Sequence, residues 1–124
     1  MNEHCVSLEL ARELKNAGWE KETEFWWIHN KIRDVWEIKY GLSECIKEHQ
    51  ESWEYYPTPL ATEILEELPG NIKKIHCLII TKMSRQWKVG YHGKIVILDK
   101  CLPNASAKCW IYLVKNSIIS RRSK

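Results

Sequence analysis

Five cysteines and five histidines are the residues of this 124-residue chain that could hold a metal ion or attack a substrate. Cys45 and His49 are four positions apart, so on a helix they would share one face and could supply two ligands of a zinc site. His76 and Cys77 are adjacent, so on a strand they would point to opposite faces, and the chain has no C-x-x-C motif. Cys45 and His49 are therefore the metal candidates, but we expect buried thiols and solvent-facing imidazoles, with no metal and no cofactor.

The sequence contains no recognisable catalytic motif. Nucleophilic catalysis needs a cysteine or serine beside an orienting base, and no G-x-S-x-G turn is present. The five glycines are scattered and form no phosphate-binding loop. The carboxylates of Glu63, Glu66 and Glu67 fall on the outer face of an expected helix, where solvation explains them. We therefore expect no catalytic residues and no enzymatic activity.

Aromatic side chains gather beside two prolines in residues 53–59, which lie outside any periodic pattern. Rigid aromatic side chains in a loop are typical anchors of protein–protein interfaces. The alternative is that each ring simply covers the sheet. The sequence favours binding of a protein partner or self-association, and the interface candidates are Trp53, Tyr55, Tyr56 and Pro57.

Lysines and arginines interleave with aromatic residues in the second half of the chain, and nucleic-acid binding is the alternative function. Cations for phosphates beside flat rings for bases are what binding of single strands requires. The candidates for this interface are Lys82, Arg85, Trp87, Lys88 and Tyr91. Trp87 and Tyr91 also alternate with Val89 in the manner of core residues on one strand face.

The net charge of +3 hides a division between the two parts of the chain. Residues 1–70 carry 15 of the 16 acidic and 7 of the 19 basic residues, a net charge of −8, whereas residues 71–124 have a net charge of +11. Such a division indicates either that the two parts attract each other within one fold or that a basic face is offered to a polyanion. Attraction within the fold is the favoured interpretation.

The hydrophobic periodicity predicts an α+β fold in which about three helices pack on a mostly antiparallel sheet as a single pair of layers. The expected helices span residues 7–17, from 58 to the Pro69-Gly70 stop, and 105–116, with Thr58 as N-cap and Pro59 in the first turn of the second. A strand pair, 24–29 and 35–40, and a three-stranded meander, 72–83, 86–91 and 94–99, form the sheet. Residues 41–57 are predicted as loop or short helix. The chain is expected to be one domain, 1–124, with a frayed basic tail at 119–124.

Seven tryptophans against one phenylalanine make the chain tryptophan-rich. Five of the indoles fall in expected strands or on a helix face and are predicted to fill the core: Trp26, Trp27, Trp36, Trp87 and Trp110.

The odd number of cysteines and the composition of the N-terminal residues predict a cytoplasmic location. A secreted scaffold usually has an even set of cysteines, and residues 1–20 lack the charged-then-apolar pattern of a signal peptide. No apolar run approaches the roughly 18 residues that span a bilayer. The sequence therefore predicts a soluble protein without a membrane partner.

Three segments resemble a family of small, uncharacterised phage- and prophage-encoded proteins. They are the opening residues 8–18 with 22–26, the central residues 53–69 and the closing residues 102–116. The resemblance covers nearly the whole chain and keeps the order of its elements. It implies a phage or bacterial origin and carries no assigned activity. We therefore expect an accessory protein of a phage or mobile element, located in the cytoplasm of a bacterial host.

Overall fold

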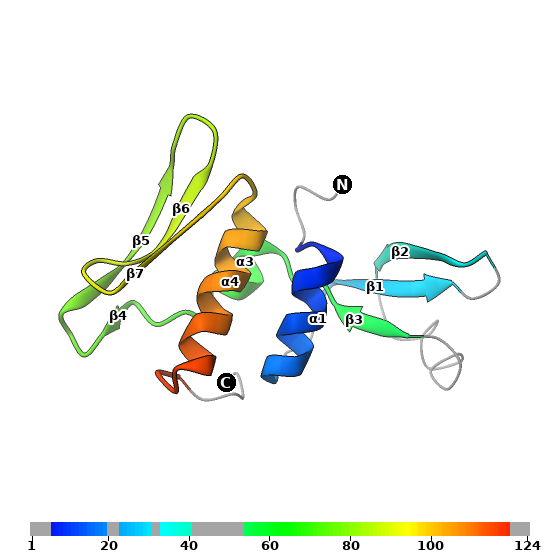
Figure 1. Ribbon diagram of the computed structural model, residues 1–124, viewed down its shortest axis with the longest axis horizontal. Helices are drawn as coiled ribbons and strands as arrows, with labels where there is room; N and C mark the ends of the chain where they lie inside the picture. The colour runs from blue at the N-terminus through cyan, green and yellow to red at the C-terminus, as the bar shows by residue number, and fades with distance from the viewer. Residues whose placement is uncertain (1–5, 20–22, 31–32, 41–53, 120–124) are drawn as a thin grey trace.

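The computed structural model describes residues 6–19, 23–30, 33–40 and 54–119 (Figure 1). In chain order the elements of these ranges are α1 (Leu8–Ala17), β1 (Phe25–Asn30), β2 (Val35–Tyr40), β3 (Tyr55–Pro57), α3 (Ala61–Leu65), β4 (Asn71–Ile72), β5 (His76–Lys82), β6 (Trp87–Tyr91), β7 (Ile95–Asp99) and α4 (Leu102–Lys115). Among the described helices, none has the length and apolar character that a bilayer crossing requires.

The strands form two antiparallel sheets, and the helices lie between them (Figure 1). The first sheet has the order β2-β1-β3 and the second the order β4-β5-β6-β7. Helix α1 contacts β3, whereas α4 contacts β6 and β7, and α1 and α4 contact each other. The predicted α+β class is confirmed. The helices nevertheless form a layer between two sheets, where a single pair of layers was expected.

Helix α1 forms where the local signals predict it. The Ser7 hydroxyl accepts a hydrogen bond from the Leu10 N–H at 3.3 Å, and Gly18 closes the helix in the left-handed region at φ 105°. Leu10 and Leu14 are buried on the face that meets the core.

Helix α4 provides most of the buried surface at the centre of the fold. The side that carries Ala107, Trp110, Ile111 and Val114 is buried, and so are residues on the opposite side, including Ala105, Cys109 and Leu113. Trp110 packs edge-to-face against Trp19, with 5.0 Å between ring centroids. Because both faces of α4 are covered, the helix is apolar around most of its circumference.

The burial of the tryptophans differs from the prediction that five of them fill the core. Trp110 is fully buried as expected, whereas Trp26, Trp27, Trp36 and Trp87 are only half-buried because they belong to strands of the outer sheets. Trp19, just past the end of α1, is the second buried indole.

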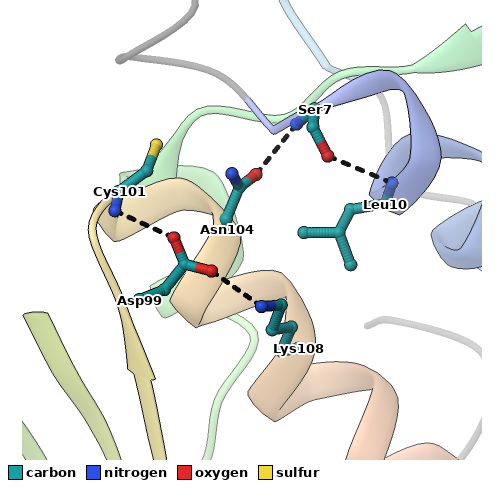
Figure 2. A network of polar contacts seen from close by, with 6 residues as sticks. All are labelled: Ser7, Leu10, Asp99, Cys101, Asn104 and Lys108. Carbon is teal, nitrogen blue, oxygen red and sulfur yellow. Dashed lines mark hydrogen bonds and ion pairs between the residues drawn. The ribbon is translucent and has the colours of Figure 1, made fainter.

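Helix α4 begins at Leu102, three residues before the predicted start. The Cys101 N–H donates to Asp99 Oδ1 at 2.9 Å, and Pro103 lies in the first turn, where its missing N–H leaves no donor unsatisfied (Figure 2). Asn104 Oδ1 accepts a hydrogen bond from the Ser7 N–H at 2.8 Å (Figure 2). The starts of α1 and α4 are therefore joined by a side chain.

The predicted start of the second helix at Thr58 is wrong. The Thr58 N–H donates to the Phe25 carbonyl oxygen at 3.1 Å, which continues the pairing of β3 with β1 and keeps this backbone extended. Helix α3 starts later, at Ala61, where the Glu63 carboxylate accepts a hydrogen bond from the Leu60 N–H at 2.7 Å.

The predicted long strand over residues 72–83 is interrupted. Lys73 and Lys74 adopt positive φ values of 53° and 63° and turn the chain between β4 and β5. Asn71 Oδ1 accepts from the Lys74 N–H at 3.0 Å and stabilises the turn. The β-branched residues in this segment favour a continuous strand, so the sequence did not predict the turn. Ile75 lies beside the turn and is exposed.

Gly90 lies where β6 and β7 come so close that only glycine fits. A Cβ atom at this position would lie 2.1 Å from the Ile95 carbonyl oxygen and 2.9 Å from the Val96 Cα. Both atoms belong to the backbone, so neither can move without disturbing the strand pair.

We expect Gly90→Ala to lower the free energy of unfolding by about 1–3 kcal/mol because the added methyl group forces the two strands apart. Urea unfolding followed by circular dichroism measures the change. Gly70→Ala is the matched control, since a Cβ there has no heavy atom within 4 Å. Equal stabilities of the two variants would contradict the close approach.

Candidate functional site

Aromatic side chains stack across one face of the β2-β1-β3 sheet. The His29 and Trp36 rings are 5.0 Å apart between centroids and 27° from parallel, and the Trp36 and Tyr56 rings are 5.7 Å apart and 26° from parallel. His29 and Trp36 are cross-strand partners, so their side chains share one face of the sheet. The result is a continuous aromatic surface supplied by all three strands of this sheet.

Two cations of α1 lie over aromatic rings of this sheet. The Arg12 guanidinium carbon is 5.2 Å from the Trp36 centroid and 5.6 Å from that of Tyr56. Lys15 Nζ is 5.2 Å from the Tyr55 centroid and 5.3 Å from that of Tyr56. Arg12 and Lys15 are three positions apart, which places them on one side of the helix.

This combination is named the cation–aromatic face and consists of Arg12, Lys15, His29, Trp36, Tyr55 and Tyr56. Arg12 and Lys15 are exposed, and no carboxylate of the described residues pairs with either of them. The rings beneath the two cations attract them and hold their side chains in place.

Asp34 fixes one end of the face. It adopts φ 54° in the turn between β1 and β2, a conformation that aspartate tolerates. From there its Oδ1 lies 2.9 Å from Nε2 of His29. This contact holds the imidazole in its stack on Trp36.

The predicted protein-interface residues belong only in part to the cation–aromatic face. Tyr55 and Tyr56 are half-buried members of it, whereas Pro57 is buried, and Trp53 lies outside the described residues. The prediction that these aromatics lie in a loop is wrong for residues 55–57, which form β3. They pair with β1, where Tyr56 lies opposite Trp27, and this pairing leaves the tyrosine rings beside α1.

Arg12, Lys15 and Trp36 were not predicted as site residues. The spacing of the two cations on an amphipathic helix was the one available signal, because it places both on the solvent side. Which rings lie beneath them depends on the packing of α1 on β3, a contact between segments distant in sequence.

The predicted nucleic-acid residues do not form one surface. Tyr91 is completely buried, and its hydroxyl donates to the Pro69 carbonyl oxygen at 2.6 Å, so the prediction that it contacts bases is wrong. Lys88 follows Trp87 on β6, so its side chain points to the opposite face of the sheet. Arg85 is exposed in the turn before β6.

Lys82 and Trp87 do come together, at a second candidate site. Lys82 Nζ lies 5.0 Å from the Trp87 ring centroid. Both residues line a cavity of about 490 Å³ at the starts of α3 and α4, named here the basic groove. Its principal lining residues are Leu60, Lys82, Trp87, Lys100, Leu102 and Pro103.

The two oppositely charged parts of the chain are not joined by ion pairs between described residues. Lys108 pairs with Asp99 at 2.7 Å, and both lie in the basic part. The remaining pairs lie in the acidic part, where Asp34 contacts His29 and Glu37 contacts Arg33 and Lys39. Within the described ranges, no ion pair supports the predicted attraction between the acidic part and the basic part.

The metal candidates Cys45 and His49 lie outside the described residues. Within the described ranges, no group of three or more histidine, cysteine or acidic side chains is arranged to hold a metal ion. His76 Nδ1 lies 2.8 Å from the His92 carbonyl oxygen, which accounts for this imidazole without a ligand.

Burial determines the chemistry of two titratable core groups. Desolvation raises the pKa of the Cys109 thiol from 9.0 to about 12. It also raises the pKa of Tyr91, with a smaller contribution from the nearby Cys109. Both groups are therefore neutral parts of the core, and Cys109 is unsuited to be a nucleophile because the thiolate is the reactive form.

Neither the family models nor the curated proteins nor the solved structures contain a match to this chain. A function for this chain is therefore inferred from the two sites themselves.

The raised pKa of Cys109 predicts a loss of stability at alkaline pH. Below pH 9.0 the thiol is protonated in both states, and between pH 9.0 and about 12 the unfolded chain loses this proton while the folded protein keeps it. Deprotonation thus favours unfolding, and the free energy of unfolding should fall as the pH rises through this window.

Urea unfolding at a series of pH values measures this fall. Cys109→Ala should be less stable than the parent at neutral pH and lose less stability on going to alkaline pH. Cys77→Ala, at an exposed thiol, should keep the parent's pH dependence. Identical alkaline losses in the parent and Cys109→Ala would show that this thiol does not titrate as inferred.

Proposed function

We propose that the protein is a non-catalytic binding module that docks a protein partner on the cation–aromatic face. The observation that carries the proposal is the placement of Arg12 over both Trp36 and Tyr56. Tryptophan, tyrosine and arginine are the residue types most enriched at the energetic centres of protein interfaces. Here the three types are in contact and belong to three secondary-structure elements, α1, β2 and β3.

The preorganisation of this face supports binding. Side chains that are ordered before a partner arrives lose less conformational entropy when the complex forms. Trp36 is stacked against His29 and against Tyr56, and Arg12 is held by the rings beneath it. The face therefore presents a fixed arrangement of rings and one guanidinium.

The charge of the face selects the partner. Arg12 and Lys15 are exposed cations without a carboxylate partner among the described residues. A segment that alternates acidic side chains with leucine or phenylalanine would pair with the cations and cover the rings. We therefore propose an acidic, amphipathic protein segment as the ligand.

The resemblance of the sequence to phage and prophage proteins supports a role as an accessory protein of a phage or mobile element. In this proposal the protein acts in the cytoplasm of a bacterial host by recruiting or masking its partner. Nucleic-acid binding through the five original candidates is less favoured, because Tyr91 is buried and Lys88 faces away from Trp87.

A short synthetic peptide of alternating glutamate and leucine tests the proposal by NMR titration. We expect its addition to shift the Trp36 indole N–H and the backbone amides around Arg12 and Tyr56. Arg12→Glu should weaken the affinity at least about tenfold, because it replaces an attractive charge with a repulsive one. The same peptide with lysine in place of glutamate should not bind.

Lys94→Glu is the matched control for Arg12→Glu. Lys94 is an exposed cation in the turn before β7, and the substitution changes the net charge by the same amount. It should leave the affinity of the peptide unchanged. Equal losses in the two variants would mean that only net charge attracts the peptide and would contradict a defined docking face.

A further inference from the structure

We propose that the basic groove is a binding site for a nucleotide unit, meaning a nucleoside that carries a phosphate. The groove is formed by elements other than those of the cation–aromatic face, so the inference does not depend on the proposed protein partner. Its volume of about 490 Å³ lies in the range of sites for small molecules, roughly 300–1,000 Å³.

The fold brings the polar residues of the groove together through strand register. Lys82 on β5 is opposite Trp87 on β6, and Trp87 is opposite Asp99 on β7, so these residues form one row across the sheet. Lys100 follows directly at the junction with α4. Lys82, Lys100 and Trp87 thereby line the same groove.

The carboxylates nearest in sequence are engaged elsewhere. Asp99 Oδ2 accepts from Lys108 Nζ at 2.7 Å, and its Oδ1 accepts from the Cys101 N–H (Figure 2). Glu63 accepts from the backbone N–H groups of Leu60 and Glu24. Neither carboxylate lines the groove, and no carboxylate of the described residues pairs with Lys82 or Lys100.

The site is therefore cationic and lacks an internal counter-ion within the described ranges. A phosphate monoester carries nearly two negative charges at neutral pH and offers three acceptor oxygens. It can receive hydrogen bonds from both ammonium groups, which is the mode in which lysine commonly binds phosphate. A carboxylate has one charge and two oxygens, so it would neutralise less of the charge of the two ammonium groups and accept fewer hydrogen bonds from them.

The remaining lining suits the base and the sugar. Trp87 is half-buried, and Lys82 lies against its ring, so the indole is held at the wall of the groove. Leu60, Leu102 and Pro103 add apolar surface. A flat base can pack on such a surface, since every base offers an apolar face to an aromatic side chain.

Titration of the full chain with adenosine 5′-monophosphate by calorimetry and NMR tests the inference. We expect saturable binding that shifts the Trp87 indole N–H and weakens as the salt concentration rises. Lys82→Ala and Lys100→Ala should each weaken the affinity about tenfold, because each removes one charge-assisted contact to the phosphate. Inorganic phosphate should bind more weakly than the nucleotide, and adenosine more weakly still.

Two control variants separate the groove from general surface charge. Lys94→Ala removes an exposed lysine in the β6–β7 turn, and Lys88→Ala removes a lysine from the other face of the sheet. Both should keep the parent affinity. If either control loses as much affinity as Lys82→Ala and Lys100→Ala, or if neither groove variant loses any, the proposed site is overturned. Circular dichroism of each variant establishes that it is folded.

A second titration, with short oligothymidylate, distinguishes the two sources of a nucleotide unit. Binding of either probe supports the proposed site only if Lys82→Ala and Lys100→Ala weaken that binding. Tighter binding of the oligonucleotide than of the mononucleotide, with a further loss in Arg85→Ala, would assign the unit to a single strand. Equal affinities would assign it to a free nucleotide. Absence of binding by both probes would overturn the proposal.

Discussion

Helix α4 lies between the four-stranded sheet on one side and α1 and α3 on the other, so it is buried around most of its circumference (Figure 1). Lys108 and Lys115 are its exposed side chains. Because α4 contacts β6, β7, α1 and α3, it is the element through which the two sheets are held relative to each other. Its small residues Ala105 and Ala107 allow close approach, and Trp110 fills the space toward α1. The rest of the fold depends on this burial, since neither small sheet has a second layer of its own.

The same arrangement explains where the two candidate sites lie. The outer side of α1, away from α4, carries the cations that cover the β2-β1-β3 sheet, so the cation–aromatic face is a by-product of the packing of α1 on β3. The basic groove forms at the other boundary, where α4 begins beside the ends of β5 and β6. Each site therefore joins a helix of the central layer to one sheet. The two sites differ in composition, since one is rich in aromatic rings and the other is lined by two lysines and one tryptophan.

The sequence predicts those parts of the fold that local chemistry determines. Ser7 and Gly18 bound α1 through capping, and the alternation of apolar and polar residues predicts β2 and β6. The errors occur where a distant segment decides the local conformation. Thr58 remains extended because its N–H bonds to Phe25, and the three residues of β3 become a strand only beside β1. The sites follow the same rule: Tyr55 and Tyr56 were identified by type, but their contacts with Arg12 and Lys15 arise from tertiary packing and have no local signature.

The hydrogen bond between the Ser7 N–H and Asn104 has a consequence for the way in which the chain reaches its structure. It joins residues 97 positions apart and ties the first turn of α1 to the first turn of α4 (Figure 2). Contacts between such distant residues cost loop entropy before they contribute any stability, and they slow folding. During synthesis α1 leaves the ribosome long before Asn104 does, so its apolar face has no α4 to cover it until nearly the whole domain has been made. Helix α1 is thus made before α4 but is secured only after α4 has been made.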